Sequence, residues 1–556
     1  MRRAVLASFV LFAPSFASAG ETQVMLMGEV PVDGPDHFFV PFMVPAGTVE
    51  IEVMHDDLSS DNILDWGLED AAGFRGWGGG NTEDAVVGAL AASRSYVAGP
   101  IAAGEWRVVV GKAQLVEAPA MYSVVVTLRD APTLAPQPER APYTAVDLGG
   151  GPRWYAGDFH VHSRESGDAA PALDEIAEFA RGRGLDFAEI SDHNTLTQLE
   201  FFNYVQELHP DLLLVPGMEY TTYQGHANAI GATAWVDHKI GQPGVTIAGA
   251  AAAFAEQGAL LSINHPVLEL GNVCIGCAWK HEVPASLSAV EVATTGLDKG
   301  GGYFTDDAIK YWDGLCATGL HVAAIGGSDD HRAGQDLDAF QSPIGDPTTM
   351  VYAESLSVAA IINGIRAGRT MVKLQGPDDP MVELTADAAI EGDTISADSV
   401  TFTATVTGAP EGSAVRFVRN GVPLGMTPIE GDPFAATVEA NAPGEGEDRW
   451  RAEVIVGSGP RTITSHLWLR EGPVEEPTSG SAPTSSGAEE EGTSGTSGAS
   501  GASSGGASSS GGTSEAGQEA PAEQGCACGV QRTGAWWLAL ALPLVRRRRA
   551  RGDRLW

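Results

Sequence analysis

GDFHVHS, residues 157–163, places two histidines two positions apart directly after the apolar run WYA. In an extended strand alternate side chains point to the same side, so His160 and His162 share one face with about 7 Å between their Cα atoms. This spacing suits chelation of one metal ion, although an isolated pair of this kind is more often structural. The stretch therefore poses a choice between a buried structural pair and half of a metal site.

The sequence around this stretch alternates apolar runs with helical segments. From about residue 145 to 375, runs such as LDFAEIS and LLLVPGME are interleaved with PALDEIAEFARGRG, AGAAAAFAEQG and YFTDDAIKYWDGLCATG. Buried strands followed by amphipathic helices predict an α/β domain with a largely parallel sheet, open or closed into a barrel.

Polar side chains stand where these predicted strands end. Ten of the thirteen histidines lie between His160 and His331. Because the carboxyl ends of parallel strands meet at one face, residues far apart in the sequence converge there. The strand ends contribute Asp158, His160, His162, Asp192, His193, Glu219, His226, His265, Glu291, Asp329, Asp330 and His331.

The order HxH, SDHN, GxE, NHP and SDDH resembles the PHP (polymerase and histidinol phosphatase) superfamily of metal-dependent hydrolases across residues 145–375. The segment CIGCAW after NHP, with a signal-like N-terminus and a preceding β region, is similar to the secreted carbaryl-hydrolase-like (CehA/McbA) branch. The resemblance implies a distorted (β/α)7 barrel that holds two or three divalent ions.

The same resemblance implies which residues hold the ions. The first ion would be bound by His160, His162, Glu219 and Asp329. Glu219 would bridge to a second ion bound by His226 and His265, and a third would be bound by Asp168, His193 and His331. From the residues alone, Asp168 could instead cap the helix that starts near Pro171.

Further polar residues lie beside the implied ligands. Asp158, Asp192 and Asp330 could each accept the second ring N–H of a histidine, or could cap a helix or face solvent. Arg332 could bind an anionic substrate, and its alternative is a solvated surface charge. We predict Asp192 and Arg332 as catalytic residues. Imidazole and carboxylate ligands suit Zn, Mn or Fe without choosing among them.

Ions in such a site lower the pKa of a bridging water, and the hydroxide attacks phosphorus or a carbonyl carbon. The predicted function is therefore a metal-dependent phosphoesterase acting on small phosphomonoesters or phosphodiesters. A carboxylic ester or carbamate hydrolase, as the carbaryl-hydrolase resemblance implies, is the alternative. A non-catalytic surface scaffold is the second alternative.

The charge balance bears on the partners. The chain has 72 acidic and 33 basic residues and a net charge of -39. Binding of a nucleic-acid polymer needs clustered Lys and Arg, so a small-molecule ester is the expected partner. The sequence does not indicate an oligomeric state.

The flanking regions predict a multidomain protein in which two all-β sandwiches flank the barrel. Residues 1–19 have a basic start, an apolar core and a small-residue cleavage site, as in a secretory signal. Residues 20–132 and 380–471 show the alternation and turn residues of β-sandwiches. The second is immunoglobulin-like, with a hairpin turn at Asn420-Gly421.

The C-terminal part predicts a tether. Residues 472–525 are Ser-, Gly- and Glu-rich with almost nothing to bury, which predicts a disordered linker. Residues 526–556 hold Cys526, Cys528, an apolar segment and an Arg cluster. This end resembles the C-terminal sorting tags of myxobacterial surface proteins; the alternative is a short membrane helix. Either way we expect an exported protein anchored at the cell surface or outer membrane.

Cys274 and Cys277 form a close pair in this exported chain. A local disulfide is the leading interpretation. A zinc knuckle is the alternative, and it would need two further ligands.

Overall fold

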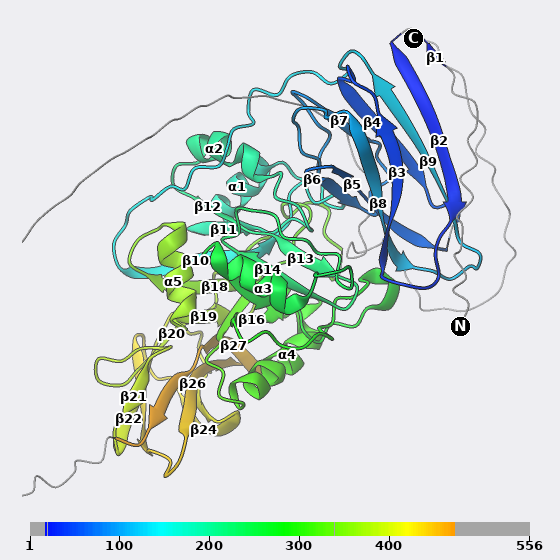
Figure 1. The fold of residues 1–556 in the computed structure, drawn as a ribbon. Helices are drawn as coiled ribbons and strands as arrows, with labels where there is room; N and C mark the ends of the chain where they lie inside the picture. Colours follow the sequence, from blue (N-terminus) through cyan, green and yellow to red (C-terminus); the bar gives the residue numbers. More distant parts are fainter. Residues whose placement is uncertain (1–16, 19, 60, 339, 473–556) are drawn as a thin grey trace, which may run out of the picture.

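The computed structural model describes residues 17–18, 20–59, 61–338 and 340–472 (Figure 1). The predicted signal peptide, apart from residues 17–18, lies outside the described residues, as do the linker beyond residue 472 and the C-terminal segment. Among the helices of the described part, none is long and apolar enough to cross a membrane.

The first region, which we call the N-terminal unit, consists of two antiparallel sheets at the upper right of Figure 1. Their alternating side chains meet in one core that includes Ile51 of one sheet and Trp66 and Val110 of the other. The first sheet has the order β1(Ala17–Ser18), β2(Glu21–Glu29), β9(Met121–Arg129), β4(Glu50–Asp56) and β7(Ala85–Gly88). The second has the order β3(His37–Val44), β8(Gly104–Gln114), β5(Ile63–Asp70) and β6(Gly73–Gly79).

The middle region divides its strands between two sheets. One contains β12(Leu213–Pro216), β11(Phe187–Ile190), β10(Arg153–Val161), β18(Thr348–Ala353) and β19(Thr370–Lys373). The other contains β13(Glu219–Thr222), β14(Gly225–Ile230), β15(Leu260–Ile263), β16(Leu287–Thr294) and β17(Ala323–Gly327). Isolated bridges join their ends at Val161–Asp330 and His193–Glu219. Closure into a regular barrel therefore stays a prediction.

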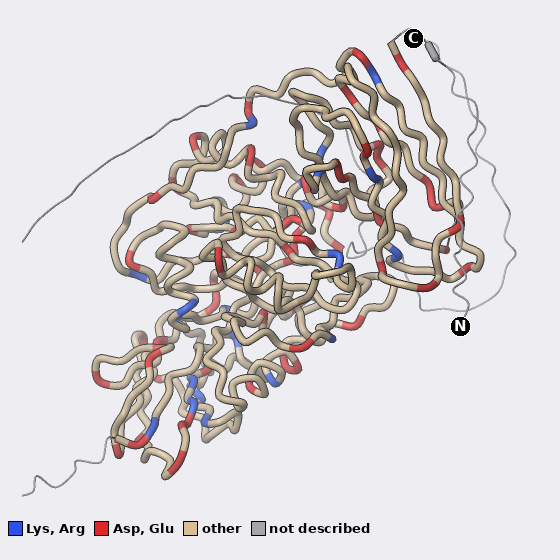
Figure 2. Tube along the Cα trace, viewed as in Figure 1, with Lys and Arg blue, Asp and Glu red and all other residues tan. Residues whose placement is uncertain are grey.

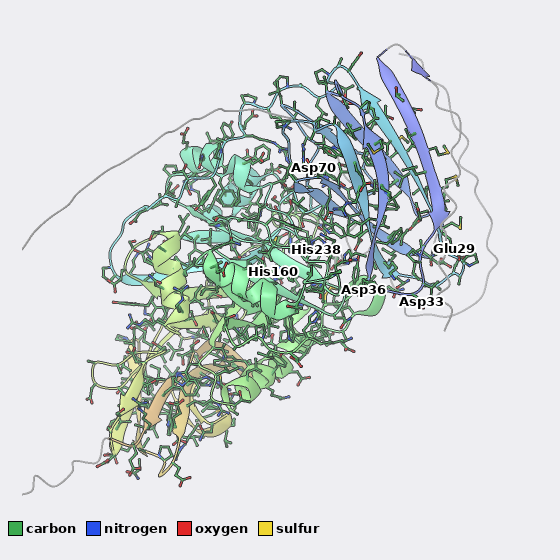
Figure 3. The ribbon with its side chains drawn as sticks, in the orientation of Figure 1. Glu29, Asp33, Asp36, Asp70, His160 and His238 are labelled. Atoms are coloured by element: carbon green, nitrogen blue, oxygen red, sulfur yellow. A yellow bond between two sulfur atoms is a disulfide. The ribbon has the colours of Figure 1, made fainter. Side chains whose placement is uncertain are left out.

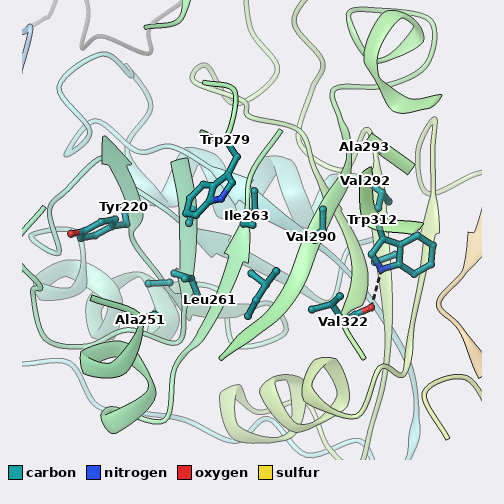
Figure 4. Packing of buried hydrophobic residues seen from close by; sticks show 14 of the residues in the cluster. Tyr220, Ala251, Leu261, Ile263, Trp279, Val290, Val292, Ala293, Trp312 and Val322 are labelled. Carbon is teal, nitrogen blue, oxygen red and sulfur yellow. Dashed lines mark hydrogen bonds between the residues drawn. The ribbon is translucent and has the colours of Figure 1, made fainter. Parts of the chain in front are cut away.

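Five α-helices accompany the described strands of this region. They are α1(Leu173–Gly182), α2(Leu199–Leu208), α3(Ile247–Glu256), α4(Gly301–Cys316) and α5(Val358–Arg366). The three helical segments quoted from the sequence correspond to α1, α3 and α4. Figure 4 shows the packing around β15 and β16, where the Trp312 indole donates a hydrogen bond to the carbonyl of Val322 at 2.8 Å.

The prediction of a largely parallel sheet is wrong for part of this region. β10–β11–β12 and β15–β16–β17 are parallel, but β14 is antiparallel to both β13 and β15, and β18 is antiparallel to β10. Only Tyr223 and Gln224 separate β13 from β14. A parallel connection needs a crossover of about a dozen residues, so this link can only form a hairpin.

The C-terminal strands continue a sheet of the middle region. β27(Gly459–Thr464) pairs with β19, with Met371 opposite Thr464. The sheet therefore crosses the boundary that we predicted near residue 380. The other strands are β20(Met381–Thr385), β21(Thr394–Ser396), β22(Ser399–Thr407), β23(Ala414–Arg419), β24(Val422–Pro428), β25(Phe434–Asn441), β26(Glu447–Val456) and β28(Leu467–Arg470). The predicted turn at Asn420-Gly421 is confirmed, because both residues have positive φ between β23 and β24.

Gly327 at the end of β17 allows β10 to approach closely. A Cβ atom there would lie 2.3 Å from the His160 Cβ and 2.7 Å from the His160 backbone nitrogen. We expect Gly327→Ala to lower the free energy of unfolding by about 1–3 kcal/mol, because the strands must separate. Gly314→Ala in α4 is the matched control, since nothing lies within 4 Å of its added Cβ. Equal chemical denaturation midpoints for the two variants would contradict this prediction.

Candidate metal centre

The structure brings the predicted metal ligands together at the ends of the strands of the middle region. Figure 3 marks His160, the next-to-last residue of β10, in this region. Within each group the possible ligand atoms lie within 4.8 Å of one another. Two groups correspond to the first two predicted sets: His160, His162 and Asp329, and Glu219, His226 and His265. A third group, His162, His193 and His331, contains two members of the third predicted set, with His162 in place of Asp168.

The carboxylate of Glu219 lies at the centre of these groups, at the start of β13. Its Oε1 is 3.3 Å from Nε2 of His160 and of His265, and 3.4 Å from Nδ1 of His226. Its Oε2 is 2.8 Å from Nδ1 of His193 and 3.7 Å from Nε2 of His162. A carboxylate whose two oxygens face different imidazoles has the geometry of a bridging ligand.

Asp329 completes the group that begins with the HxH pair. Its Oδ1 lies 3.4 Å from Nε2 of His160 and 3.1 Å from Nε2 of His162. Its backbone is left-handed, with φ of 55°, and its N–H donates to the carbonyl of His160 at 2.8 Å. This turn directs the carboxylate toward the two rings, and the side chain keeps 21% exposure.

Asp168 lies between two histidines. Its Oδ2 is 3.3 Å from Nε2 of His193 and 3.3 Å from Nε2 of His331. Helix α1 has Ala172 as its N-cap residue. Asp168 is therefore not the N-cap residue of α1, and its carboxylate faces two candidate ligands.

The second ring nitrogens of these histidines contact groups outside the ligand set. His160 Nδ1 is 3.0 Å from Glu291 Oε1, and His162 Nδ1 is 3.2 Å from Ser166 Oγ. His265 Nδ1 lies 3.2 Å from the carbonyl of Cys277. Such partners hold a ring so that its other nitrogen faces the centre. Our predicted site did not include Glu291 or Ser166, although we expected Glu291 at a strand end; it lies within β16.

The acids that we expected to orient rings contact backbone instead. Asp192 accepts hydrogen bonds from the N–H and Oγ of Ser163, both at 2.6 Å. Asp158 accepts from the N–H of Gly345 at 2.7 Å, and Asp330 from the N–H of Gly334 at 2.7 Å. These carboxylates hold the turns that carry the ligands, and burial raises the pKa of Asp192 to about 8.

Arg332 and the cysteine pair lie beside the centre. Arg332 is half-buried, and its guanidinium forms no hydrogen bond or ion pair with any residue that the structure describes. The predicted disulfide between Cys274 and Cys277 is present. Both sulfurs also lie within 4.8 Å of a His226 ring nitrogen. The CIGC segment therefore covers one side of the candidate centre.

The charges within the centre balance one another. Burial opposes charge on Glu219 and Asp168, yet the surrounding imidazoles hold the pKa of both carboxyls well below the ordinary value. Burial likewise opposes protonation of His160, whose pKa the nearby carboxylates hold well above the ordinary value. Burial and the neighbouring imidazoles lower the pKa of His162 to about 3.

Several buried atoms at the centre form no hydrogen bond within the described part of the chain. They are Nε2 of His160, His162 and His331, Oε2 of Glu219, and both carboxylate oxygens of Asp168. A buried polar group without a partner is costly, and divalent cations bound within the ligand groups would satisfy these atoms. The donor set of imidazole nitrogens and carboxylate oxygens fits Zn, Mn or Fe.

Comparisons with known proteins give partial structural overlaps. No protein-family model and no curated protein match the chain. A two-domain protein from Bacteroides vulgatus that contains a predicted PHP-like metal-dependent phosphoesterase is 19% identical, covering 59% of this chain and 99% of that one, with a TM-score of 0.34. An amidohydrolase from Chromobacterium violaceum with bound sulfate and no metal is 14% identical, covering 34% and 93%, with a TM-score of 0.23. Both TM-scores are low, so a function has to be inferred from the chain's own side chains.

Glu291 connects two candidate ligands, because its Oε1 contacts the His160 ring and its Oε2 accepts from the His265 backbone N–H at 2.7 Å. We expect Glu291→Gln to weaken metal binding about 10–100-fold, since the His160 ring loses its carboxylate partner. Competition with a metal-binding dye measures the affinity. Glu447→Gln, whose partner His321 lies outside the centre, is the control. Unchanged affinity in Glu291→Gln would show that the pair does not orient the ligand.

Protons compete with metal ions for the centre. Burial opposes charge on His331, yet Asp168 and Asp329 raise its pKa to about 9, so the metal-free protein holds a proton there at neutral pH. Metal binding needs the neutral ring and displaces this proton. We expect the affinity for Zn²⁺ or Mn²⁺ to rise with pH up to about 9 and to fall on acidification. Calorimetry in buffers of different ionisation enthalpy measures the released proton, and a buffer-independent enthalpy would contradict this expectation.

Proposed function

We propose that this chain is a metal-dependent hydrolase of the PHP type, most closely allied to the carbaryl-hydrolase-like (CehA/McbA) branch. The observation that carries the proposal is the set of buried nitrogen and oxygen atoms that face one another without hydrogen bonds. Such an arrangement is costly unless cations occupy it. The three ligand groups would accommodate two or three divalent ions, because Glu219 also contacts His160 and His193 of the other two groups.

Bound divalent ions would supply a hydroxide at neutral pH and would stabilise negative charge on the substrate. The side chains of this chain determine where a substrate enters. Asp329 is 21% exposed and His331 8%, whereas His160 and His162 are fully buried. The accessible side of the centre is therefore the Asp329–His331 turn. Arg332 is the next residue in the chain.

A small phosphomonoester or phosphodiester is the substrate class that we propose. Arg332 beside the accessible ligands offers a guanidinium without a protein partner among the described residues, and guanidinium groups bind phosphate oxygens through paired hydrogen bonds. Figure 2 shows Asp and Glu along all described parts of the chain, and the net charge is -39. This charge disfavours a nucleic-acid polymer as substrate.

We also propose that the protein is exported and anchored at the cell surface. The signal-like residues 1–19 and the Cys, apolar and Arg segments of residues 526–556 support this proposal. An export signal before the hydrolytic region and an anchor after it would place that region outside the cell.

Hydrolysis assays test the proposed activity. The purified protein, loaded with Mn²⁺ or Zn²⁺, should hydrolyse p-nitrophenyl phosphate or bis-p-nitrophenyl phosphate faster than p-nitrophenyl acetate. The double variant His160→Ala, His162→Ala should lose metal and at least about 100-fold in kcat/KM, because the first ligand group is removed. His321→Ala is the control, since His321 pairs with Glu447 outside the centre.

The outcomes separate the alternatives. Preference for the acetate ester would support a carboxylic ester or carbamate hydrolase instead. A folded wild-type protein that binds no metal would leave only a non-catalytic scaffold. Arg332→Gln should raise KM for the phosphate esters and leave the acetate ester unaffected, and equal effects on both would remove Arg332 from substrate binding.

A further inference from the structure

The loop that carries Asp168 has no regular secondary structure of its own. It lies between the end of β10 at Val161 and the start of α1 at Leu173. Apart from its contacts with His193 and His331, the Asp168 carboxylate accepts no hydrogen bond within the described chain. Its position must therefore come from contacts that hold the loop backbone.

Arg94 of the N-terminal unit supplies such contacts. Its Nη1 donates to the carbonyl of Arg164 at 3.2 Å and to that of Ala169 at 3.0 Å. Its Nη2 donates to the carbonyl of Gly167 at 2.8 Å. The contacted carbonyls lie on both sides of Asp168. The Arg94 side chain is 10% exposed, and Glu83 accepts a hydrogen bond from its Nε at 3.0 Å.

The residue after Arg94 contacts the same loop. The N–H of Ser95 donates to Glu165 Oε2 at 2.9 Å, and its hydroxyl donates to the Glu165 carbonyl at 2.7 Å. Glu165 Oε2 also accepts from the Thr197 hydroxyl at 2.8 Å, on the segment that follows His193. The N-terminal unit is thereby connected to both sides of the Asp168–His193 contact.

The loop also lies directly against the backbone of the N-terminal unit. Gly167 has φ of 74°, and a Cβ there would be 2.6 Å from the carbonyl oxygen of Gly78. The two backbones therefore leave no room for a Cβ at position 167.

We infer that Arg94 is a positioning residue of the metal centre, holding the backbone on both sides of Asp168 so that its carboxylate stands between His193 and His331. The inference rests on the proposed function, because it assigns Asp168, His193 and His331 to an ion. It also gives the N-terminal unit a role in the hydrolase. A guanidinium offers five N–H donors in a planar fork, whereas a lysine ammonium is a single point of charge.

The test compares Arg94→Gln and Arg94→Lys with Asp168→Asn. The number of ions per chain after loading with Mn²⁺ or Zn²⁺ is measured by elemental mass spectrometry. The affinity of the protein for its most weakly bound ion is measured by dye competition. We expect Arg94→Gln to lose the same ion as Asp168→Asn, or to bind it at least about tenfold more weakly, while the other ions stay bound. Arg94→Lys should show the same loss to a smaller extent, because its ammonium cannot reach all three carbonyls.

Arg107→Gln is the matched control. Arg107 belongs to β8 of the same unit and pairs with Glu69 at 3.0 Å. Amide hydrogen exchange of residues 163–170 should accelerate in Arg94→Gln and not in Arg107→Gln. If Arg94→Gln instead lost its structure in general, it would lose every ion, and the unfolding midpoint of the metal-free protein would fall. In that case Arg94→Lys and Ser95→Ala serve as the milder variants.

Three outcomes separate this inference from the proposed function. If the wild-type protein binds ions and Arg94→Gln binds them with unchanged number and affinity, the positioning role of Arg94 is wrong and the hydrolase proposal stands. If Asp168→Asn loses an ion that all Arg94 variants keep, the positioning role is also wrong. If the wild-type protein binds no metal, the proposed function itself fails.

Discussion

The carboxylate of Glu219 among the imidazoles is the constraint on which the rest of the structure depends. Glu219 is 1% exposed, and its oxygens lie between 2.8 and 3.7 Å from five histidines. Removing this many titratable groups from water is costly unless opposite charges and ions compensate. The surrounding elements therefore have to hold each ring at a defined angle, which explains the carboxylates and hydroxyls around the ligands.

Strand geometry alone does not produce this arrangement. His160 lies in β10 and His162 directly after it, but Glu219 and His226 come from the hairpin of β13 and β14, which reverses the chain direction. The register sets Glu219 opposite Asn228 and Thr221 opposite His226, so Glu219 and His226 lie on the same face of the hairpin. A uniformly parallel barrel would need a crossover between these strands, which the two residues Tyr223 and Gln224 cannot provide.

The gathering of the candidate ligands could be predicted from the sequence because their signal is local: HxH, SDHN and SDDH each follow an apolar run. The disulfide and the Asn420-Gly421 turn were predictable for the same reason. The pairing of β19 with β27 was not, because an apolar strand looks the same whichever strand it joins. The direction of β14 was missed, although its two-residue link to β13 requires a hairpin. The ring partner of His160, Glu291, was visible as a strand-end acid, but its role depends on a contact across 131 positions.

The N-terminal unit shows why separate β regions need not be separate in function. Its sequence carries only the alternation of a sheet protein, and Arg94 there has no motif around it. Its importance comes from docking, which brings its guanidinium to carbonyls 70 to 75 positions away. A loop that must supply a carboxylate to a charged centre cannot be held by apolar packing alone, because its backbone carbonyls also need partners. Arg94 of the neighbouring N-terminal unit meets both requirements. A functional form of the protein would therefore have to contain both this unit and the candidate centre.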